Sequence, residues 1–327
     1  MLRRAVFSGF RGFLPSRMYF ALRPMLLIKD DRGSSVGYFW TNTVWYLLLF
    51  AVTIAMIAIA QAKADNRRFL AVFTMAVLGL FYLFEYSLVI VLDAYRYHPM
   101  ITPDDGFQDT VLGNIFSQTS IAAACGLIIA LRLRPRWYFV FAAAYYLIEL
   151  AFVRLGIYEP NWYEAIYTPI ILVPLFCAIR RWHNHAASSR SEVSANAVLC
   201  LAVMSATAQT VFLPLKLAEI HVFTGGFFED PSRDHTTTLL FYMVCLAGAV
   251  VYVYRLKIGW KWKALLIALL YPLQAAVYQT GLMKFRQGWF PWATALEIGV
   301  ILFWTVVMDR LVRQRRPMAD GLPKAVP

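Results

Sequence analysis

Long apolar segments recur along the whole chain, and they constrain its fold more than any other feature of the sequence. A helix needs about 20 apolar residues to cross the roughly 30 Å of hydrocarbon in a bilayer. Windows of this length predict nine membrane-spanning helices, at residues 37–60, 69–92, 111–131, 137–155, 162–179, 195–217, 236–254, 262–280 and 289–312. The predicted fold is therefore all-α, a polytopic transmembrane helix bundle in contact with the lipid bilayer.

The composition agrees with a chain surrounded by lipid. Of the 327 residues, 60% are hydrophobic and 15% are charged, whereas soluble domains have about half and about a quarter. The formal net charge of +12 comes from short basic clusters between apolar segments. This pattern is typical of loops beside anionic lipid and does not indicate nucleic-acid binding. All four cysteines lie in apolar segments without metal-site or disulfide spacing, which indicates small packing residues.

The positions of lysine and arginine predict the orientation of the helices. Loops at 61–68, 132–136, 180–194 and 255–263, with the tail from residue 310, contain 18 of these residues, and the alternate loops contain four. The positive-inside rule places the basic loops and the C-terminus in the cytoplasm. Nine helices then put segment 1–36 outside, although it contains seven basic residues. The alternatives for this segment are an interfacial helix, a targeting segment, or a later start at Met18 or Met25.

The two halves of the chain align when the sequence is shifted by 125 residues. The pairs that this register brings together include Asp109 with Asp234, Trp137 with Trp262, and Gly156 with Gly281. A repeat of four helices keeps both copies in the same orientation, related by an axis along the membrane normal. The predicted organisation is a basic N-terminal segment (1–36), an extra transmembrane helix (37–60), a first four-helix repeat (69–182), a second four-helix repeat (195–316) and a C-terminal tail (317–327).

The first repeat ends in a run of aromatic and polar residues. Segment 156–163 reads Gly-Ile-Tyr-Glu-Pro-Asn-Trp-Tyr, and Tyr167 and Thr168 follow it. The repeat closes with the segment 180–182, Arg-Arg-Trp. This pattern resembles a group of small, uncharacterised multi-pass membrane proteins of endospore-forming bacteria, mainly over residues 69–182. The resemblance implies a bacterial plasma (inner) membrane and no known activity.

Four polar side chains lie inside the predicted helices and are the candidate ligand-binding residues: Glu85, Glu149, Gln274 and Glu297. Counting about 1.5 Å of rise per residue places each of them about 10–12 Å below the outer surface. An ionisable group at the centre of a membrane helix costs at least about 2.5–3.5 kcal/mol, so each one needs a reason. Their shared depth predicts one polar layer, open to the outside, that binds a cation or small polar solute. The alternative is hydrogen bonding between helices, with the carboxylates protonated or paired.

Acidic residues in the outer loops form a predicted rim above this layer: Asp104, Asp105, Asp109, Glu229, Asp230 and Asp234. Asp109 and Asp234 immediately precede predicted helices, where a carboxylate caps the helix and complements its dipole. Calcium binding is the alternative for such oxygen ligands, but the spacing is not that of an EF-hand. The sequence therefore predicts no metal site.

Enzyme signatures are absent from the sequence. It contains no H-E-x-x-H, P-loop, G-x-S-x-G or dinucleotide motif, and all five histidines lie in predicted loops. No catalytic residue and no cofactor is predicted. The favoured function is transporter-like binding of a small polar solute or cation between the two repeats. The alternatives are a non-catalytic structural or sensory membrane protein and a membrane-embedded lipid-modifying enzyme. The sequence leaves the substrate and the oligomeric state open.

Overall fold

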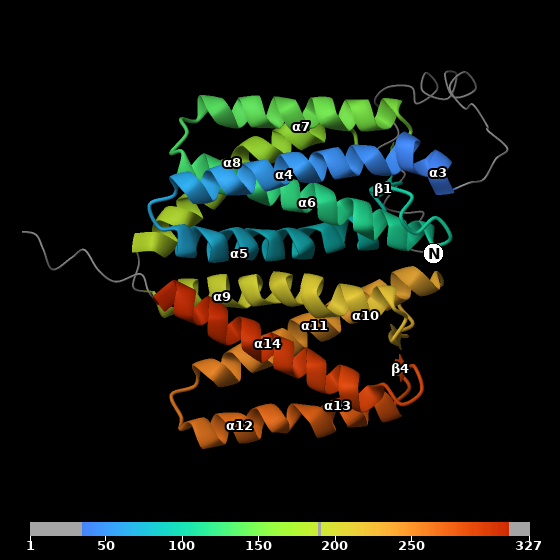
Figure 1. Ribbon diagram of the computed structural model, residues 1–327, viewed down its shortest axis with the longest axis vertical. Helices are drawn as coiled ribbons and strands as arrows, with labels where there is room; N and C mark the ends of the chain where they lie inside the picture. Colours follow the sequence, from blue (N-terminus) through green and yellow to red (C-terminus); the bar gives the residue numbers. More distant parts are fainter. Residues whose placement is uncertain (1–34, 189–190, 314–327) are drawn as a thin grey trace, which may run out of the picture. The chain divides into compact units, whose positions relative to one another are not determined.

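The computed structural model describes residues 35–188 and 191–313 (Figure 1). Residues up to Trp40 form one unit, and residues from Thr41 onward form another. The described part of the first unit is α3 (Ser35–Tyr38) with Phe39 and Trp40, whose rings are in edge contact at 5.1 Å between centroids. Of the predicted N-terminal segment 1–36, residues 1–34 lie outside the described residues, and so does the whole predicted tail 317–327.

The second unit is built from helices, as predicted. In chain order, the elements after the π-helical turn η1 (Phe39–Thr43) are α4 (Val44–Lys63), α5 (Arg67–Glu85) with η2 (Tyr86–Val91), α6 (Gly106–Ala130), α7 (Arg136–Arg154), α8 (Tyr167–Ser188), α9 (Glu192–Thr207) with η3 (Ala208–Phe212) and α10 (Leu213–Leu217), α11 (Pro231–Arg255), α12 (Trp260–Ala268), α13 (Leu270–Gln279) and α14 (Phe290–Arg313).

Six helices in the described part of the chain are long and apolar enough to cross a membrane. They are Phe39–Lys63, Arg67–Val91, Gly106–Ala130, Arg136–Arg154, Glu192–Leu217 and Pro231–Arg255. These six match the first four predicted segments and the sixth and seventh. An all-α, multi-pass membrane protein is therefore confirmed, and α8, α12 with α13, and α14 complete the unit.

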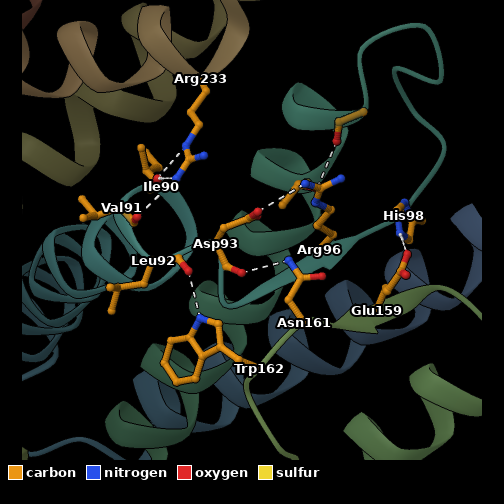
Figure 2. Close-up of polar contacts among 12 residues, drawn as sticks. Ile90, Val91, Leu92, Asp93, Arg96, His98, Glu159, Asn161, Trp162 and Arg233 are labelled. Atoms are coloured by element: carbon orange, nitrogen blue, oxygen red, sulfur yellow. Dashed lines mark hydrogen bonds and ion pairs between the residues drawn. The ribbon is translucent and has the colours of Figure 1, made fainter. Parts of the chain in front are cut away.

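Helix α8 begins five residues later than the predicted segment 162–179. The preceding residues are held in a loop, because the backbone N–H groups of Asn161 and Trp162 donate to the Ala94 carbonyl at 3.0 and 3.3 Å. The Trp162 indole also donates to the Leu92 carbonyl at 2.8 Å (Figure 2). These contacts hold residues 161–162 against residues 92–94, and the helix begins only after this loop.

The predicted helix 262–280 is interrupted between α12 and α13. Pro272 lies in the first turn of α13 and has no backbone N–H to donate to the Ala268 carbonyl one turn earlier. The missing hydrogen bond accounts for the break at Leu269.

Two short antiparallel strand pairs were not predicted from the sequence; helices separate the two strands of each pair along the chain, and we call each pair a hairpin for brevity. Strand β1 (Tyr95–Tyr97) pairs with β2 (Tyr158–Pro160), and β3 (His221–Phe223) pairs with β4 (Met283–Phe285). In Figure 1, β1 and β4 lie at the same end of the helices. We call this end the hairpin end. Helices α5 and α9 both run toward this end. Their last residues therefore lie on the same side of the unit, although the two helices are far apart in the sequence.

One prediction about the acidic residues at the hairpin end was wrong, namely which aspartates cap the helices. Asp105 and Asp230, not Asp109 and Asp234, are the N-cap residues of α6 and α11. Asp109 and Asp234 lie four residues later, in the first turn of each helix, and are buried. The helices begin earlier than predicted, because the polar residues between each N-cap and the apolar segment already form a helical turn.

The buried carboxylates accept backbone hydrogen bonds from the loop before each helix. The donors to Asp109 are the N–H groups of Met100, Ile101 and Thr102, at 2.8–3.0 Å. The donors to Asp234 are those of Gly225, Gly226, Phe227 and Phe228, at 2.6–3.3 Å. The first three donors in each set are 125 residues apart, as are the two acceptors. These contacts therefore recur at the same 125-residue spacing as the sequence alignment.

Helix α5 packs along α9 through small residues. A Cβ atom added at Gly79 would lie 2.2 Å from the Leu201 carbonyl oxygen, so the two helix backbones approach closely there. Ala76 and Ala202, near this contact in sequence, are fully buried. Close approach through small residues is typical of helix pairs in membranes, where dispersion contacts and not water exclusion drive association.

Candidate functional site

The four predicted ligand-binding residues fall into two separate groups. Glu85 and Glu149 line a cavity of about 100 Å³, and Gln274 and Glu297 meet at a different side chain, Tyr242. We call the first space the tyrosine cavity. Its polar and aromatic lining consists of Phe81, Phe84, Glu85, Tyr95, Tyr97, Ser117, Gln118, Tyr145, Glu149, Phe152, Tyr158, Tyr163 and Thr168. A space of this volume holds several water molecules or one small solute.

Glu85 is the last residue of α5, and its carboxylate is held from two sides. The Tyr95 hydroxyl donates to Oε2, and the Gln118 side-chain amide donates to Oε1 at 2.6 Å. The residue is 6% exposed. Both carboxylate oxygens therefore have a donor, and the position of the side chain is fixed by β1 and α6.

Glu149 on α7 has one oxygen without a partner. The Thr168 hydroxyl of α8 donates to Oε2, whereas Oε1 is buried and has no hydrogen-bond partner within the described segments. Thr168 in turn lies 3.2 Å from the Tyr163 hydroxyl. A buried acceptor of this kind needs a donor. The Tyr158 hydroxyl lies near this carboxylate, and a donor on a bound ligand could also satisfy Oε1.

Four tyrosines form the aromatic wall of the cavity at the hairpin end. The ring of Tyr95 lies 5.5 Å from Tyr97, 5.3 Å from Tyr158 and 5.3 Å from Tyr163, measured between centroids. Burial raises the pKa of Tyr163 to about 12 and raises the pKa values of Tyr95 and Tyr97 well above the usual range. These hydroxyls therefore remain protonated, and they present neutral oxygens and ring faces to an occupant.

The charge of the tyrosine cavity has one sign. Its lining contains two carboxyl groups, Glu85 and Glu149, and no lysine, arginine or histidine. A cationic occupant would be attracted by both carboxylates, and an anion would be repelled. The cavity can therefore accept a proton donor or a small cation.

The second group centres on Tyr242 of α11. Its hydroxyl lies 2.7 Å from Gln274 Oε1 and 2.6 Å from Glu297 Oε2. A phenol carries one proton and can serve only one acceptor at a time. Turning the Gln274 amide round would place its NH₂ group, which has no partner among the described residues, against the phenol oxygen. Gln274 and Glu297 are therefore linked through one hydroxyl.

His221 of β3 approaches the same cluster. Its Nδ1 atom lies 3.7 Å from Glu297 Oε1, and both side chains are fully buried. Burial, reinforced by the nearby charge of Lys216, lowers the pKa of His221 to about 4. The imidazole is therefore neutral at physiological pH.

A further cavity of about 130 Å³ lies between α5–η2, α6, η3–α10 and α11. We call it the lysine cavity, after Lys216. Glu85 lines both the tyrosine cavity and the lysine cavity, whereas Glu297 lines neither. Glu85 therefore lies in the space between the two predicted repeats. Neither cavity brings Glu85 and Glu297 together.

The predicted acidic rim divides by burial. Asp104, Glu229 and Asp230 are exposed, Asp105 is half-buried, and Asp109 and Asp234 bind backbone N–H groups. Within the parts of the chain that the structure describes, no group of three or more His, Cys, Asp or Glu side chains could hold a metal ion. Among the rim residues, Asp105 and Asp230 cap helices, and Asp109 and Asp234 bind the loops before those helices.

Sequence reasoning missed most of the tyrosine cavity. Tyr95, Tyr97 and Tyr158 lie in predicted loops and Tyr163 lies at the start of the predicted helix 162–179, and tyrosine is common at such interfacial positions. Gln118, a polar residue inside a predicted helix, was the signal that could have been used. No protein family, no curated protein and no solved structure matches this chain, so its function has to be inferred from these cavities and their side chains.

Proposed function

We propose that this chain is a transporter-like membrane protein that binds a small organic cation in the tyrosine cavity. Its architecture is nine spans, with α4 as an extra helix followed by two parallel four-helix repeats, α5–α8 and α9–α14. The observation that carries the binding proposal is the unpartnered Oε1 of Glu149 in a cavity with a second carboxylate and no basic side chain.

Recurring contacts support the duplication. The N-caps Asp105 and Asp230 are 125 residues apart, and so are Gly156 and Gly281, which both adopt positive φ, at 70° and 82°. In each half, the first strand precedes the long helix, α6 or α11, and its partner strand lies further along the chain, after α7 or α13. Even a loop contact recurs: the Asn161 N–H donates to the Ala94 carbonyl, and the Arg286 N–H donates to the Ile220 carbonyl.

The lining favours an organic cation over an inorganic one. Carboxylates attract either kind, but aromatic ring faces bind ammonium groups through their quadrupoles, as in the aromatic cages that recognise quaternary ammonium ligands. The tyrosine cavity combines Glu85 and Glu149 with five tyrosines and several aliphatic side chains. Methyl groups on nitrogen would contact those aliphatic and ring surfaces, while the positive charge faces the carboxylates.

The hairpin end is proposed to face the outside of a bacterial plasma membrane, with the C-terminus in the cytoplasm. The exposed acidic residues of this end and the basic loops of the opposite end support this orientation. In a cysteine-free variant, Glu229→Cys should react with an impermeant maleimide on intact cells, and Lys257→Cys should react only after lysis. The reverse pattern would overturn the orientation.

Binding can be tested with tetramethylammonium and the purified protein in detergent, by isothermal titration calorimetry. Glu149→Gln keeps the acceptor for Thr168 and removes the charge, so affinity should fall at least about tenfold, equivalent to ~1.4 kcal/mol. The matched control is Glu164→Gln, an exposed residue of the loop before α8. The neutral analogue with carbon in place of nitrogen should bind weakly to the unmodified protein.

Two results would contradict the cation site. Equal affinities of the unmodified protein for tetramethylammonium and its neutral analogue would mean that charge is not recognised. Unchanged tetramethylammonium binding in Glu149→Gln would favour the alternative in which the carboxylates only connect helices.

A further inference from the structure

The lysine cavity contains a buried cation without an anionic partner. Lys216 is 5% exposed, and its Nζ donates to the Thr236 hydroxyl at 2.7 Å. Among the described residues, no carboxylate lies within ion-pair distance of this nitrogen. Thr236 gives its own proton to the Ser232 carbonyl, so it serves Lys216 only as an acceptor. An ammonium group has three donors, and two of them are left for an occupant.

The nearby carboxylates are engaged elsewhere. Glu85, which lines the same cavity, accepts hydrogen bonds from Tyr95 and Gln118. Asp105 accepts from the Gln108 N–H and from the Ser232 hydroxyl. A buried charge that lacks an anionic partner destabilises the folded protein. An anion that enters the cavity would recover part of this cost.

Most of the remaining cavity wall is apolar, although Tyr82, Glu85, Tyr86 and Asn114 also line it. It is formed mainly by aliphatic side chains from both predicted repeats, including Val89, Val111, Ile115, Leu213, Leu239, Leu240 and Met243. Leu213 and Leu240 are half-buried, which leaves an edge of this wall at the surface of the helices. Lys216 is the penultimate residue of α10, so the charge lies at the hairpin end of the cavity. A ligand with one anionic head and an apolar chain matches this arrangement.

The volume limits the size of the apolar part. A dry cavity of about 150 Å³ holds one benzene molecule, and the lysine cavity has about 130 Å³. It can therefore enclose several carbons of one chain, but not the two chains of a phospholipid.

We propose that the lysine cavity is a binding site for a single-chain carboxylate amphiphile, a medium-chain fatty acid, with its carboxylate on Lys216 and its chain against the aliphatic wall. The ligand would contact both predicted repeats, because α5–α6 and η3–α11 line the same space. The site differs in charge and ligand from the tyrosine cavity, with which it shares Glu85.

The test uses octanoate carrying a ¹³C carboxyl label, with the protein in nanodiscs of phosphatidylcholine, and NMR titration of the labelled carbon. Octanoate should bind with at least about tenfold higher affinity than octanol, which has the chain without the charge. Lys216→Met should weaken octanoate binding by about tenfold or more, whereas Lys216→Arg should stay within about threefold. The control is Lys284→Met, which removes an exposed lysine of β4, and it should leave the affinity unchanged.

Folding and the cation site provide internal checks. Lys216→Met removes an unpaired buried charge, so its thermal stability should be equal or higher. Tetramethylammonium should bind Lys216→Met to the same extent as it binds the unmodified protein, because Lys216 does not line the tyrosine cavity. Octanoate binding of normal affinity in Lys216→Met, or equal binding of octanol and octanoate by the unmodified protein, would overturn the proposal.

Discussion

The Nδ1 atom of His221 lies 3.7 Å from Oε1 of Glu297, and neither atom has a hydrogen-bond partner within the described segments. The other hairpin has a related arrangement, in which the Tyr95 hydroxyl donates to Glu85. His221 and Tyr95 are each the first residue of the first strand of their hairpin. In each half, the first strand thus places one side chain beside a buried glutamate. The side chain is a tyrosine beside Glu85 and a histidine beside Glu297.

The contribution of His221 to protein stability should fall as the pH decreases from about 6.5 to about 4. Burial lowers the pKa of His221 to about 4, from about 6.5 in an unfolded chain. The unfolded chain therefore binds a proton before the folded one does, and the stabilisation present above pH 6.5 is lost through this range. The shift corresponds to a loss on the order of 3 kcal/mol.

Thermal unfolding across this pH range measures the effect. His221→Gln should lose the part of the pH dependence that His221 contributes, while His235, Lys216 and Glu297 remain nearby. The matched control, His98→Gln at the same end of the helices, should keep it, because His98 is partly exposed. A variant at 221 with the original slope would rule out this histidine as the origin.

Gly79→Ala should destabilise the protein. The added Cβ would lie 2.2 Å from the Leu201 carbonyl oxygen, so α5 and α9 would have to separate. Overpacking of this kind costs about 1–3 kcal/mol. Gly248→Ala in α11 has nothing within 4 Å of the new atom, and it should be neutral or stabilising by up to about 1 kcal/mol. Thermal unfolding of both variants in the same detergent measures the difference. A Gly79→Ala variant as stable as Gly248→Ala would contradict the prediction.

The sequence was sufficient for the membrane class and for most helix positions. Bilayer thickness imposes a minimum apolar length on each span whatever its neighbours are, so six predicted segments coincide with helices of the right length and composition. The later start of α8 could not be predicted, because it depends on the Trp162 indole reaching a carbonyl 70 residues away. Contacts at such separation leave no local periodicity.

For the candidate site, the sequence predicted a common depth but could not predict how the residues group. Counting residues along a helix places Glu85, Glu149, Gln274 and Glu297 at similar heights. It does not give the rotation of each helix or its neighbours, and these decide that Glu149 faces Glu85 while Gln274 meets Glu297. The hairpins have strands of three residues, too short for an alternating pattern to be recognised.

Arg233→Gln should loosen the end of η2. The Arg233 guanidinium of α11 donates to the Ile90 carbonyl through Nε at 2.7 Å and to the Val91 carbonyl at 3.2 Å (Figure 2). A cation there satisfies carbonyls that a helix end leaves without partners and complements the helix dipole. Hydrogen exchange should therefore accelerate in segment 86–92, with a loss of stability of about 1–3 kcal/mol. Arg96→Gln is the control, because Arg96 pairs with the exposed Asp93 instead. Equal exchange in both variants would contradict the prediction.

Asp109→Asn and Asp234→Asn should have similar effects, because each carboxylate accepts several N–H groups of the loop before it. An amide places an NH₂ donor where the loop presents donors, so each variant should lose about 2–3 kcal/mol. The controls Asp104→Asn and Glu229→Gln alter exposed residues of the same loops and should change stability by less than about 0.5 kcal/mol. Thermal unfolding would compare all four. A large loss at one aspartate with none at the other would mean that the two loops are not equivalent, which would count against a common origin for the two halves.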